Sequence, residues 1–105
     1  MTTMYIDGKN LPVFRASLHN HSTSSDGTFT IPQLATHYRD AGYDVFSISD
    51  HDVSNDITGI EIPGITILSG VELHPLGPRG ILWHILALGV PGDFKAKGYS
   101  SGAEA

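Results

Sequence analysis

Residues 18–27 read Leu-His-Asn-His-Ser-Thr-Ser-Ser-Asp-Gly, so a His-x-His pair follows an apolar run and leads into a polar, acidic loop. Successive side chains of a β-strand alternate between its two faces, so His19 and His21 can point to the same side. Two imidazoles on one side can bind one metal ion. Taken alone, such a pair is about as often a pair of surface histidines as a metal site.

Three further clusters of metal-binding residue types occur at the end of, or inside, an apolar run typical of a β-strand. They are Ser-Asp-His-Asp at 49–52 after the run 45–48, Gly-Val-Glu at 70–72 after the run 65–68, and His84 within 81–88. Imidazole and carboxylate ligands together suit zinc, manganese or iron. The four clusters together therefore predict a metal site.

The same clusters resemble the motifs of the PHP family, the polymerase and histidinol phosphatase domain. The matching residues are His19-Asn20-His21 with Ser25-Asp26-Gly27, then Asp50-His51, then Gly70-Val71-Glu72, and finally His84. They occur in the family's order, and the resemblance covers residues 14–90. Four motifs in one order make the resemblance specific.

The resemblance implies a distorted seven-unit (β/α)7 TIM-like barrel, with up to three divalent metal ions at the C-terminal ends of its strands. It implies that His19, His21 and Glu72 bind the first metal, that Glu72 bridges to a second metal also bound by His84, and that Asp26 and His51 bind the third. The family takes three further ligands, a His, an Asp and a final His, from later strands. This sequence contains no counterpart of those three.

Chain length limits how much of the barrel can form. A complete barrel of this kind takes about 250 residues, or about 200 at the low end, whereas this chain has 105. We therefore expect residues 1–90 to form the N-terminal part of a PHP domain, about half a barrel. Residues 91–105 are rich in Gly, Ser and Lys and are expected to form a flexible tail. Between His51 and Glu72, residues 53–60 have room for at most one or two helical turns.

The local patterns predict an α/β fold with a mainly parallel sheet. Residues 5–11 predict a hairpin around Asp-Gly, and residues 14–18 predict the first core strand. A helix is expected over 31–41, because Thr30 and Gln33 form a capping box and Gly42 can end it. Its apolar residues fall on one face, as a helix that covers a sheet requires; they are Ile31, Leu34, Ala35 and Tyr38.

Three other residues have weaker patterns. His74 lies two residues after Glu72, so strand alternation can place both on one face, although the family pattern does not use it. Asp50 is interpreted as an outer carboxylate that accepts the N–H of a ligating imidazole. His37 is expected on the exposed side of the helix.

Composition excludes several classes of protein. The chain is 40% hydrophobic and 16% charged, and its longest apolar stretch, 81–90, is far shorter than the roughly 20 residues of a membrane span. It has 11 acidic and 6 basic residues, net charge −5, and the basic residues are scattered, which argues against a nucleic-acid partner. The absence of cysteine excludes disulfides and thiolate ligands. No secretion signal opens the chain, so a cytoplasmic location is expected.

The expected function is metal-dependent hydrolysis of a small-molecule phosphate ester by metal-activated water, as in a phosphoesterase. Because ligands of the family are missing, we expect weak or no activity from this chain. Two alternatives stay open: a truncated chain without turnover, and a non-catalytic metal-binding regulatory or assembly module. A half barrel leaves the strand at 81–88 with an unpaired edge, so we also expect a homo-oligomer.

Overall fold

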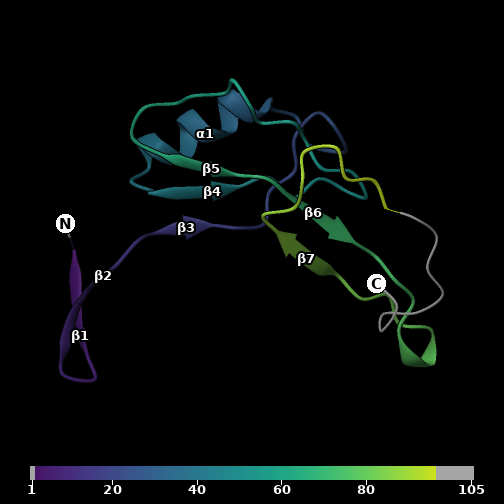
Figure 1. The fold of residues 1–105 in the computed structure, drawn as a ribbon. Helices are drawn as coiled ribbons and strands as arrows, with labels where there is room; N and C mark the ends of the chain where they lie inside the picture. Colours follow the sequence, from purple (N-terminus) through teal and green to yellow (C-terminus); the bar gives the residue numbers. More distant parts are fainter. Residues whose placement is uncertain (1, 97–105) are drawn as a thin grey trace.

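The computed structural model describes residues 2–96 and shows a mixed α/β fold (Figure 1). In chain order its elements are β1 (Thr3–Ile6), β2 (Lys9–Pro12), β3 (Ala16–Ser17), α1 (Ile31–Asp40), β4 (Val45–Ser47), β5 (Thr66–Leu68), β6 (Gly70–Leu73), the 3-10 helix η1 (Pro78–Gly80) and β7 (Ile85–Leu88). Within the described residues the strands form three small sheets, β1-β2, β3-β4-β5 and β6-β7.

The N-terminal hairpin predicted around Asp-Gly is confirmed. Strands β1 and β2 pair antiparallel, and the two residues between them, Asp7 and Gly8, have φ of 50° and 79°. Positive φ at both central residues is the geometry that two-residue hairpin turns favour. All residues of both strands are exposed, and the hairpin stands apart from the other sheets (Figure 1).

The parallel sheet β3-β4-β5 supports the predicted α/β pattern. Strand β4 lies in the middle, with Phe46 opposite Ser17 on one side and Ile67 on the other. The expectation of a mainly parallel sheet is wrong for the rest of the chain, because β1-β2 and β6-β7 are antiparallel. Strand β3 has only two residues, shorter than the predicted 14–18. The barrel itself stays a prediction.

Helix α1 covers one face of this sheet (Figure 1), and its predicted capping box is confirmed. The Thr30 side chain accepts from the Gln33 backbone N–H at 3.4 Å, and the Gln33 side chain accepts from Thr30 N–H at 2.9 Å. The core packs Ile31 and Ala35 of the helix against Phe46 of β4 and against Ile48, which follows that strand. Full burial of an aromatic side chain such as Phe46 stabilises a fold by about 1.5–3 kcal/mol.

The short helix allowed for residues 53–60 does not form. Asp56 instead accepts hydrogen bonds from the backbone N–H and the hydroxyl of Thr58, and a turn joins Ile60 N–H to the Ile57 carbonyl. An Asp that binds the backbone two residues on competes with helix formation. Gly59, with φ of 81°, completes the turn. No helix within residues 2–96 has the length and apolar character needed to cross a bilayer.

Residues 91–96 pack along the loop that follows β4. The Ser54 N–H donates to the Phe94 carbonyl at 3.0 Å, and the Ala96 N–H donates to the Asp52 carbonyl at 2.8 Å. The part of the expected tail that covers 97–105 lies outside the described residues. Within residues 91–96, the hydrogen bonds of Phe94 and Ala96 join this first part of the expected tail to the backbone of the loop.

Strand β6 is buried along its whole length and pairs antiparallel with β7. A side chain at Gly70 would come within 2.7 Å of the Ile48 carbonyl and 2.9 Å of the Ser47 hydroxyl. The absence of a side chain there therefore lets β6 approach the end of β4 closely. Glu72 follows two residues later, on the part of β6 that faces the predicted site.

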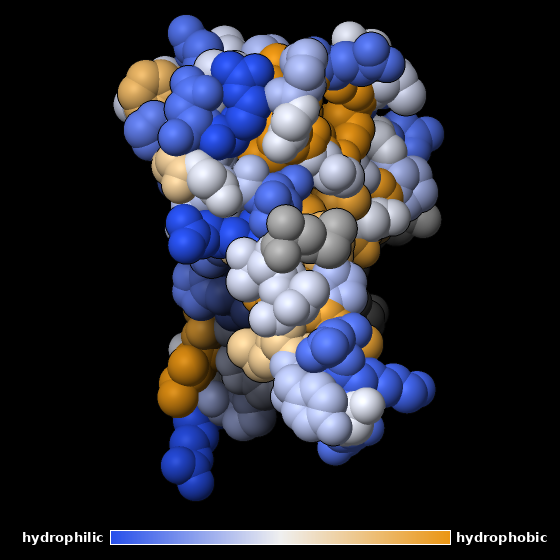
Figure 2. Space-filling view, turned by 90° about the vertical axis from the view of Figure 1, so that its left-hand side faces the viewer, coloured by the Kyte–Doolittle hydropathy of each residue, from blue (hydrophilic) through white to orange (hydrophobic). Residues whose placement is uncertain are grey.

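Several large apolar side chains stay exposed in the described part of the chain. Figure 2 shows apolar patches between hydrophilic residues on one face of the molecule. The most exposed lie in the hairpin, on either side of β3 and around η1; they are Met4, Tyr5, Phe14, Phe29, Leu76, Ile81 and Leu82. Such patches commonly mark contact surfaces.

Candidate metal centre

Backbone hydrogen bonds bring three distant segments to one place. The Ser49 N–H donates to the Asn20 carbonyl at 2.8 Å, which ties the His-x-His segment to the end of β4. The Glu72 N–H donates to the Asp50 carbonyl at 3.0 Å, and the Asp52 N–H donates to the Glu72 carbonyl at 3.1 Å. This pairing continues β4 alongside β6. Side chains that follow β3, that follow β4 and that lie on β6 therefore meet at one edge, as the ends of parallel strands do.

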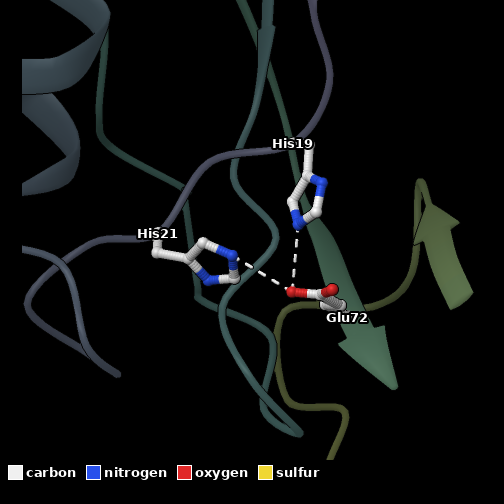
Figure 3. A group of neighbouring side chains, drawn as sticks. All are labelled: His19, His21 and Glu72. Carbon is white, nitrogen blue, oxygen red and sulfur yellow. Dashed lines mark ion pairs between the residues drawn. The ribbon is translucent and has the colours of Figure 1, made fainter. Parts of the chain in front are cut away.

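The His-x-His pair converges on Glu72 (Figure 3). His19 Nε2 lies 3.0 Å from Glu72 Oε1, and His21 Nε2 lies 3.1 Å from the same oxygen. The Glu72 side chain is 2% exposed, whereas that of His19 is 48% exposed. The group therefore has a buried carboxylate at its base and an imidazole open to solvent at its rim.

Asp26 and His51 lie beside this group. His51 Nε2 is 3.1 Å from Asp26 Oδ2, and His21 Nδ1 is 3.6 Å from Asp26 Oδ1. The rings of His21 and His51 stack, with centroids 4.3 Å apart and planes at 14°. Asp26 thus faces one edge of both stacked rings.

The second carboxylate oxygen of Glu72 faces two more histidines. His84 Nδ1 lies 2.8 Å from Glu72 Oε2, and His74 Nε2 lies 3.5 Å from it. His74 Nε2 is also 3.1 Å from His51 Nδ1. Five of the chain's six histidines therefore gather around one carboxylate, while His37 is exposed on α1, as expected.

All six residues named from the sequence as metal ligands lie in this cluster; they are His19, His21, Asp26, His51, Glu72 and His84. Their role as ligands stays a prediction. Three overlapping groups have ligand atoms close enough to share an ion: His19, His21 and Glu72; His21, Asp26 and His51; His51, Glu72 and His74. The sequence pattern ranked His74 below the others, although its spacing from Glu72 pointed to the right face.

Electrostatics keep Glu72 ionised. Burial by itself raises the pKa of Glu72, but contacts with His84 and His19 and the positive charge of His19 and His74 outweigh burial and lower the pKa to about 2. The carboxylate is therefore an anion at neutral pH, as a metal ligand must be.

Asp50 has a different set of partners from the one expected. Its oxygens accept from the Ser22 N–H at 2.7 Å, the Ser22 hydroxyl at 2.6 Å, the Ser25 hydroxyl at 2.6 Å and the Asn55 amide at 2.8 Å. These donors are backbone, hydroxyl and amide groups, not the imidazole predicted from sequence. Burial raises the pKa of Asp50, but these four hydrogen bonds lower it further than burial raises it. Asp50 thus fixes the loop that carries Asp26.

Gly27 closes this loop where another residue would not fit. A side chain at Gly27 would collide with the backbone of His21 and Ser22. The Gly27 N–H donates to the Ser22 carbonyl at 2.9 Å. The Ser-Asp-Gly sequence therefore returns the chain to the His-x-His segment and leaves Asp26 facing the stacked rings.

The donor set fits a divalent cation. Ligand atoms at about 2.0–2.2 Å from one ion lie about 3.0–3.4 Å from each other, and the two imidazole nitrogens lie 3.0 and 3.1 Å from Glu72 Oε1. Glu72 Oε1 and His21 Nδ1 are buried without a hydrogen-bond partner in the described part of the chain. Buried polar atoms are normally satisfied, so Glu72 Oε1, which two imidazole nitrogens face, points to an ion as the group that satisfies it.

The chain is similar to a phosphodiesterase. It is 33% identical over 78 residues to a protein of Eggerthella lenta named phosphoribosyl 1,2-cyclic phosphate 1,2-diphosphodiesterase. The match covers 70% of this chain but only 30% of the length of that protein. No family model matches the chain, and no solved structure matches it.

Proposed function

We propose that this chain is a metal-dependent phosphoesterase of the PHP family, with the first part of a distorted seven-unit barrel as its fold. The observation that carries the proposal is the cluster itself, in which five imidazoles surround one buried carboxylate that lacks a hydrogen bond on Oε1. The similarity to a protein named a phosphodiesterase supports the same chemistry.

The proposed first metal is held by His19, His21 and Glu72, and His84, Asp26 and His51 are the further ligands that the family resemblance implies. Zinc, manganese and iron all suit such ligands. A divalent ion bound there would act as a Lewis acid that lowers the pKa of a water molecule and polarises a phosphoryl oxygen.

The residues of the chain prepare the site for such an ion. Glu72 supplies a negative charge at the base of the site, because contacts with the surrounding imidazoles keep the Glu72 carboxylate ionised by lowering its pKa. His19 and His84, whose side chains are 48% and 62% exposed, line the open side that a substrate would approach. Asp50 holds the loop that carries Asp26 through three hydrogen bonds from Ser22 and Ser25. This site needs no nucleophilic serine or cysteine.

The proposed substrate class is a phosphodiester of a small molecule. The name of the Eggerthella lenta protein describes a cyclic phosphate diester of a sugar. An open, metal-lined rim suits a small anion, because bound divalent ions reverse the negative charge of a carboxylate site. Because that name describes a diester, we expect a phosphodiester to be cleaved faster than a monoester with the same leaving group.

A second candidate function is metal-dependent stabilisation without turnover. The described apolar core is small, with six buried apolar side chains: Ile31, Ala35, Phe46, Ile48, Val71 and Leu73. A metal that joins the segments after β3 and β4 to β6 would stabilise such a fold by binding only the folded state. Metal binding without hydrolysis would favour this function.

The test is hydrolysis of bis(p-nitrophenyl) phosphate by the full chain with manganese or zinc added. We expect metal-dependent release of nitrophenol, reduced by about 100-fold or more in Glu72→Gln, which keeps the size of the side chain but removes its charge. His37→Ala, on the exposed side of α1, is the matched control and should keep the rate of the wild type. A wild type that binds metal but releases no nitrophenol would contradict the phosphoesterase proposal.

A further inference from the structure

The stacked rings of His21 and His51 lie between two carboxylates. Their outer nitrogens face Asp26, at 3.6 Å for His21 Nδ1 and 3.1 Å for His51 Nε2. Their inner nitrogens face Glu72 Oε1, at 3.1 Å for His21 Nε2 and 3.7 Å for His51 Nδ1. Both rings therefore present one nitrogen to the buried carboxylate and the other to the exposed one.

A neutral imidazole has one N–H donor and one nitrogen with a free lone pair. Asp26 Oδ2 lies 3.1 Å from His51 Nε2, and a carboxylate can only accept, so this contact is a hydrogen bond in the tautomer that carries the ring proton on Nε2. The lone pair of His51 then lies on Nδ1, which faces His74 Nε2 at 3.1 Å. The carboxylate fixes which nitrogen of His51 is free to bind a metal.

We propose that His74 Nε2, His51 Nδ1 and Glu72 bind a second divalent ion, and that Asp26 is a positioning residue that orients His51 for this role. The inference rests on the proposed function, because it adds a second ion to the site that Glu72 shares with His19 and His21. His74 is not among the ligands that the family resemblance implies. In this inference Asp26 is not a metal ligand; its carboxylate accepts a hydrogen bond from the His51 ring.

The separations of the three ligand atoms suit one ion. His51 Nδ1 and His74 Nε2 are 3.1 Å apart, and they lie 3.7 and 3.5 Å from the oxygens Oε1 and Oε2 of Glu72. Ligands of one ion are about 3.0–3.4 Å apart, so shifts of a few tenths of an ångström complete the site. His74 would bind through the lone pair of Nε2, with its ring proton on Nδ1.

Burial favours the inner position over one beside Asp26. The side chains of His51 and His74 are 32% and 21% exposed and Glu72 is 2% exposed, whereas Asp26 is 68% exposed. A carboxylate so exposed binds an ion more weakly, because water competes for the ion and screens the charge. The same carboxylate still orients an imidazole through a hydrogen bond.

Metal stoichiometry tests the role of His74. After titration with zinc and removal of excess metal, elemental analysis should find two ions in the wild type and one in His74→Ala and His74→Gln. His37→Ala should bind two ions, as the wild type does, and circular dichroism checks that each variant is folded. If His74→Ala and His74→Gln both keep two ions, His74 is not a ligand and the inference is wrong.

Two aspartate variants separate positioning from ligation. Asp26→Asn keeps an oxygen acceptor for His51 Nε2–H but loses the negative charge, so it should keep two ions with nearly unchanged affinity. Asp26→Ala loses the acceptor and should weaken the second binding step by about 10–100-fold. If Asp26→Asn and Asp26→Ala both lose a whole ion, Asp26 is a ligand and its positioning role is wrong.

Nitrogen NMR of the histidine rings reports which atom binds zinc. We expect His51 to coordinate through Nδ1 and to keep a proton on Nε2, while the family assignment predicts coordination through Nε2 beside Asp26. A zinc-bound Nε2 on His51 would overturn the inference without affecting the first ion at His19, His21 and Glu72. A wild type that binds no zinc at all would overturn the proposed function as well. Failure of the inference alone is therefore distinguishable from failure of the proposed function.

Discussion

At the scale of single residues, the centre depends on two buried carboxylates that serve different purposes. Glu72 faces imidazoles through both of its oxygens and is available to an ion. Asp50, fully buried one residue before His51, accepts four hydrogen bonds from neutral donors and has no capacity left for a metal. The same side-chain chemistry therefore gives a ligand in one place and a structural anchor in the other.

Asp50 should make stability depend on pH in the metal-free protein. Its pKa is lower in the folded chain than the ordinary 3.8, so the unfolded chain binds more protons as the pH falls below that value. The contribution of Asp50 is complete above its ordinary pKa and is lost as the pH falls through the lower, folded pKa. We expect urea unfolding between pH 5 and pH 2 to show this loss.

The variant Asp50→Asn provides the comparison. It should be less stable than the wild type at pH 7 by about 1–3 kcal/mol, because one buried oxygen that accepts hydrogen bonds becomes a donor. Its stability should also fall less steeply than that of the wild type as the medium becomes acidic. Equal slopes for the two proteins would show that Asp50 does not cause the acid sensitivity.

At the scale of elements, helix α1 and the ligand cluster at the strand ends are specified by different kinds of interaction. The helix is specified locally by Thr30 and Gln33 at its start and by the apolar residues on one face. The site is specified by pairing between segments far apart in the sequence, such as His51 opposite Glu72. Changes in the helix should therefore alter stability while leaving the ligand cluster in place.

Thr30→Ala should destabilise the chain by about 1 kcal/mol, because the Thr30 hydroxyl accepts a hydrogen bond from the Gln33 backbone N–H in the first turn of α1. Urea unfolding measures the change. Thr36→Ala, inside the same helix and away from the cap, is the control and should be neutral or slightly stabilising because alanine has the higher helix propensity. A Thr30→Ala variant as stable as the control would contradict the role of the capping box.

At the scale of the whole molecule, the chain is more extended than a closed domain. The radius of gyration is 15.9 Å, compared with about 13 Å expected for a compact domain of this length. Large apolar side chains near η1 and β7 stay in contact with water, with Ile81 at 60% and Leu82 at 57% exposed. Strand β7 pairs with β6 alone among the described strands.

We propose that this surface self-associates, because an exposed apolar edge strand tends to pair with another chain. Light scattering after size exclusion should give a mass above the 11.3 kDa of one chain. Leu88→Lys, on β7, should shift the protein toward the monomer, whereas Leu11→Lys, exposed to a similar extent on the hairpin, should not. A wild type that elutes as a monomer would contradict self-association through β7.

The sequence by itself determined the features whose cause lies within a few neighbouring residues. The turn at Asp7-Gly8, the cap at Thr30 and the apolar face of α1 could be predicted because each depends on interactions no more than about seven residues apart. His19 and His21 lie after β3 and outside the described strands, but their imidazoles still face the same oxygen of Glu72. The six expected ligands could be named because the four motifs resemble those of the PHP family in residue type and order, and their role as ligands stays a prediction.

Only the tertiary structure decided how these residues combine. The sequence could not show that β6 and β7 run antiparallel, or that Asp50 binds hydroxyl groups and an amide. Nor could it place His74 beside His51, because that 3.1 Å contact depends on which strands pair and in what register. The contact of His74 with His51 and the hydrogen bonds of Asp50 with the loop at 22–25 join residues more than twenty positions apart. Their geometry exists only when the core around Phe46 and Ile48 fixes the strands.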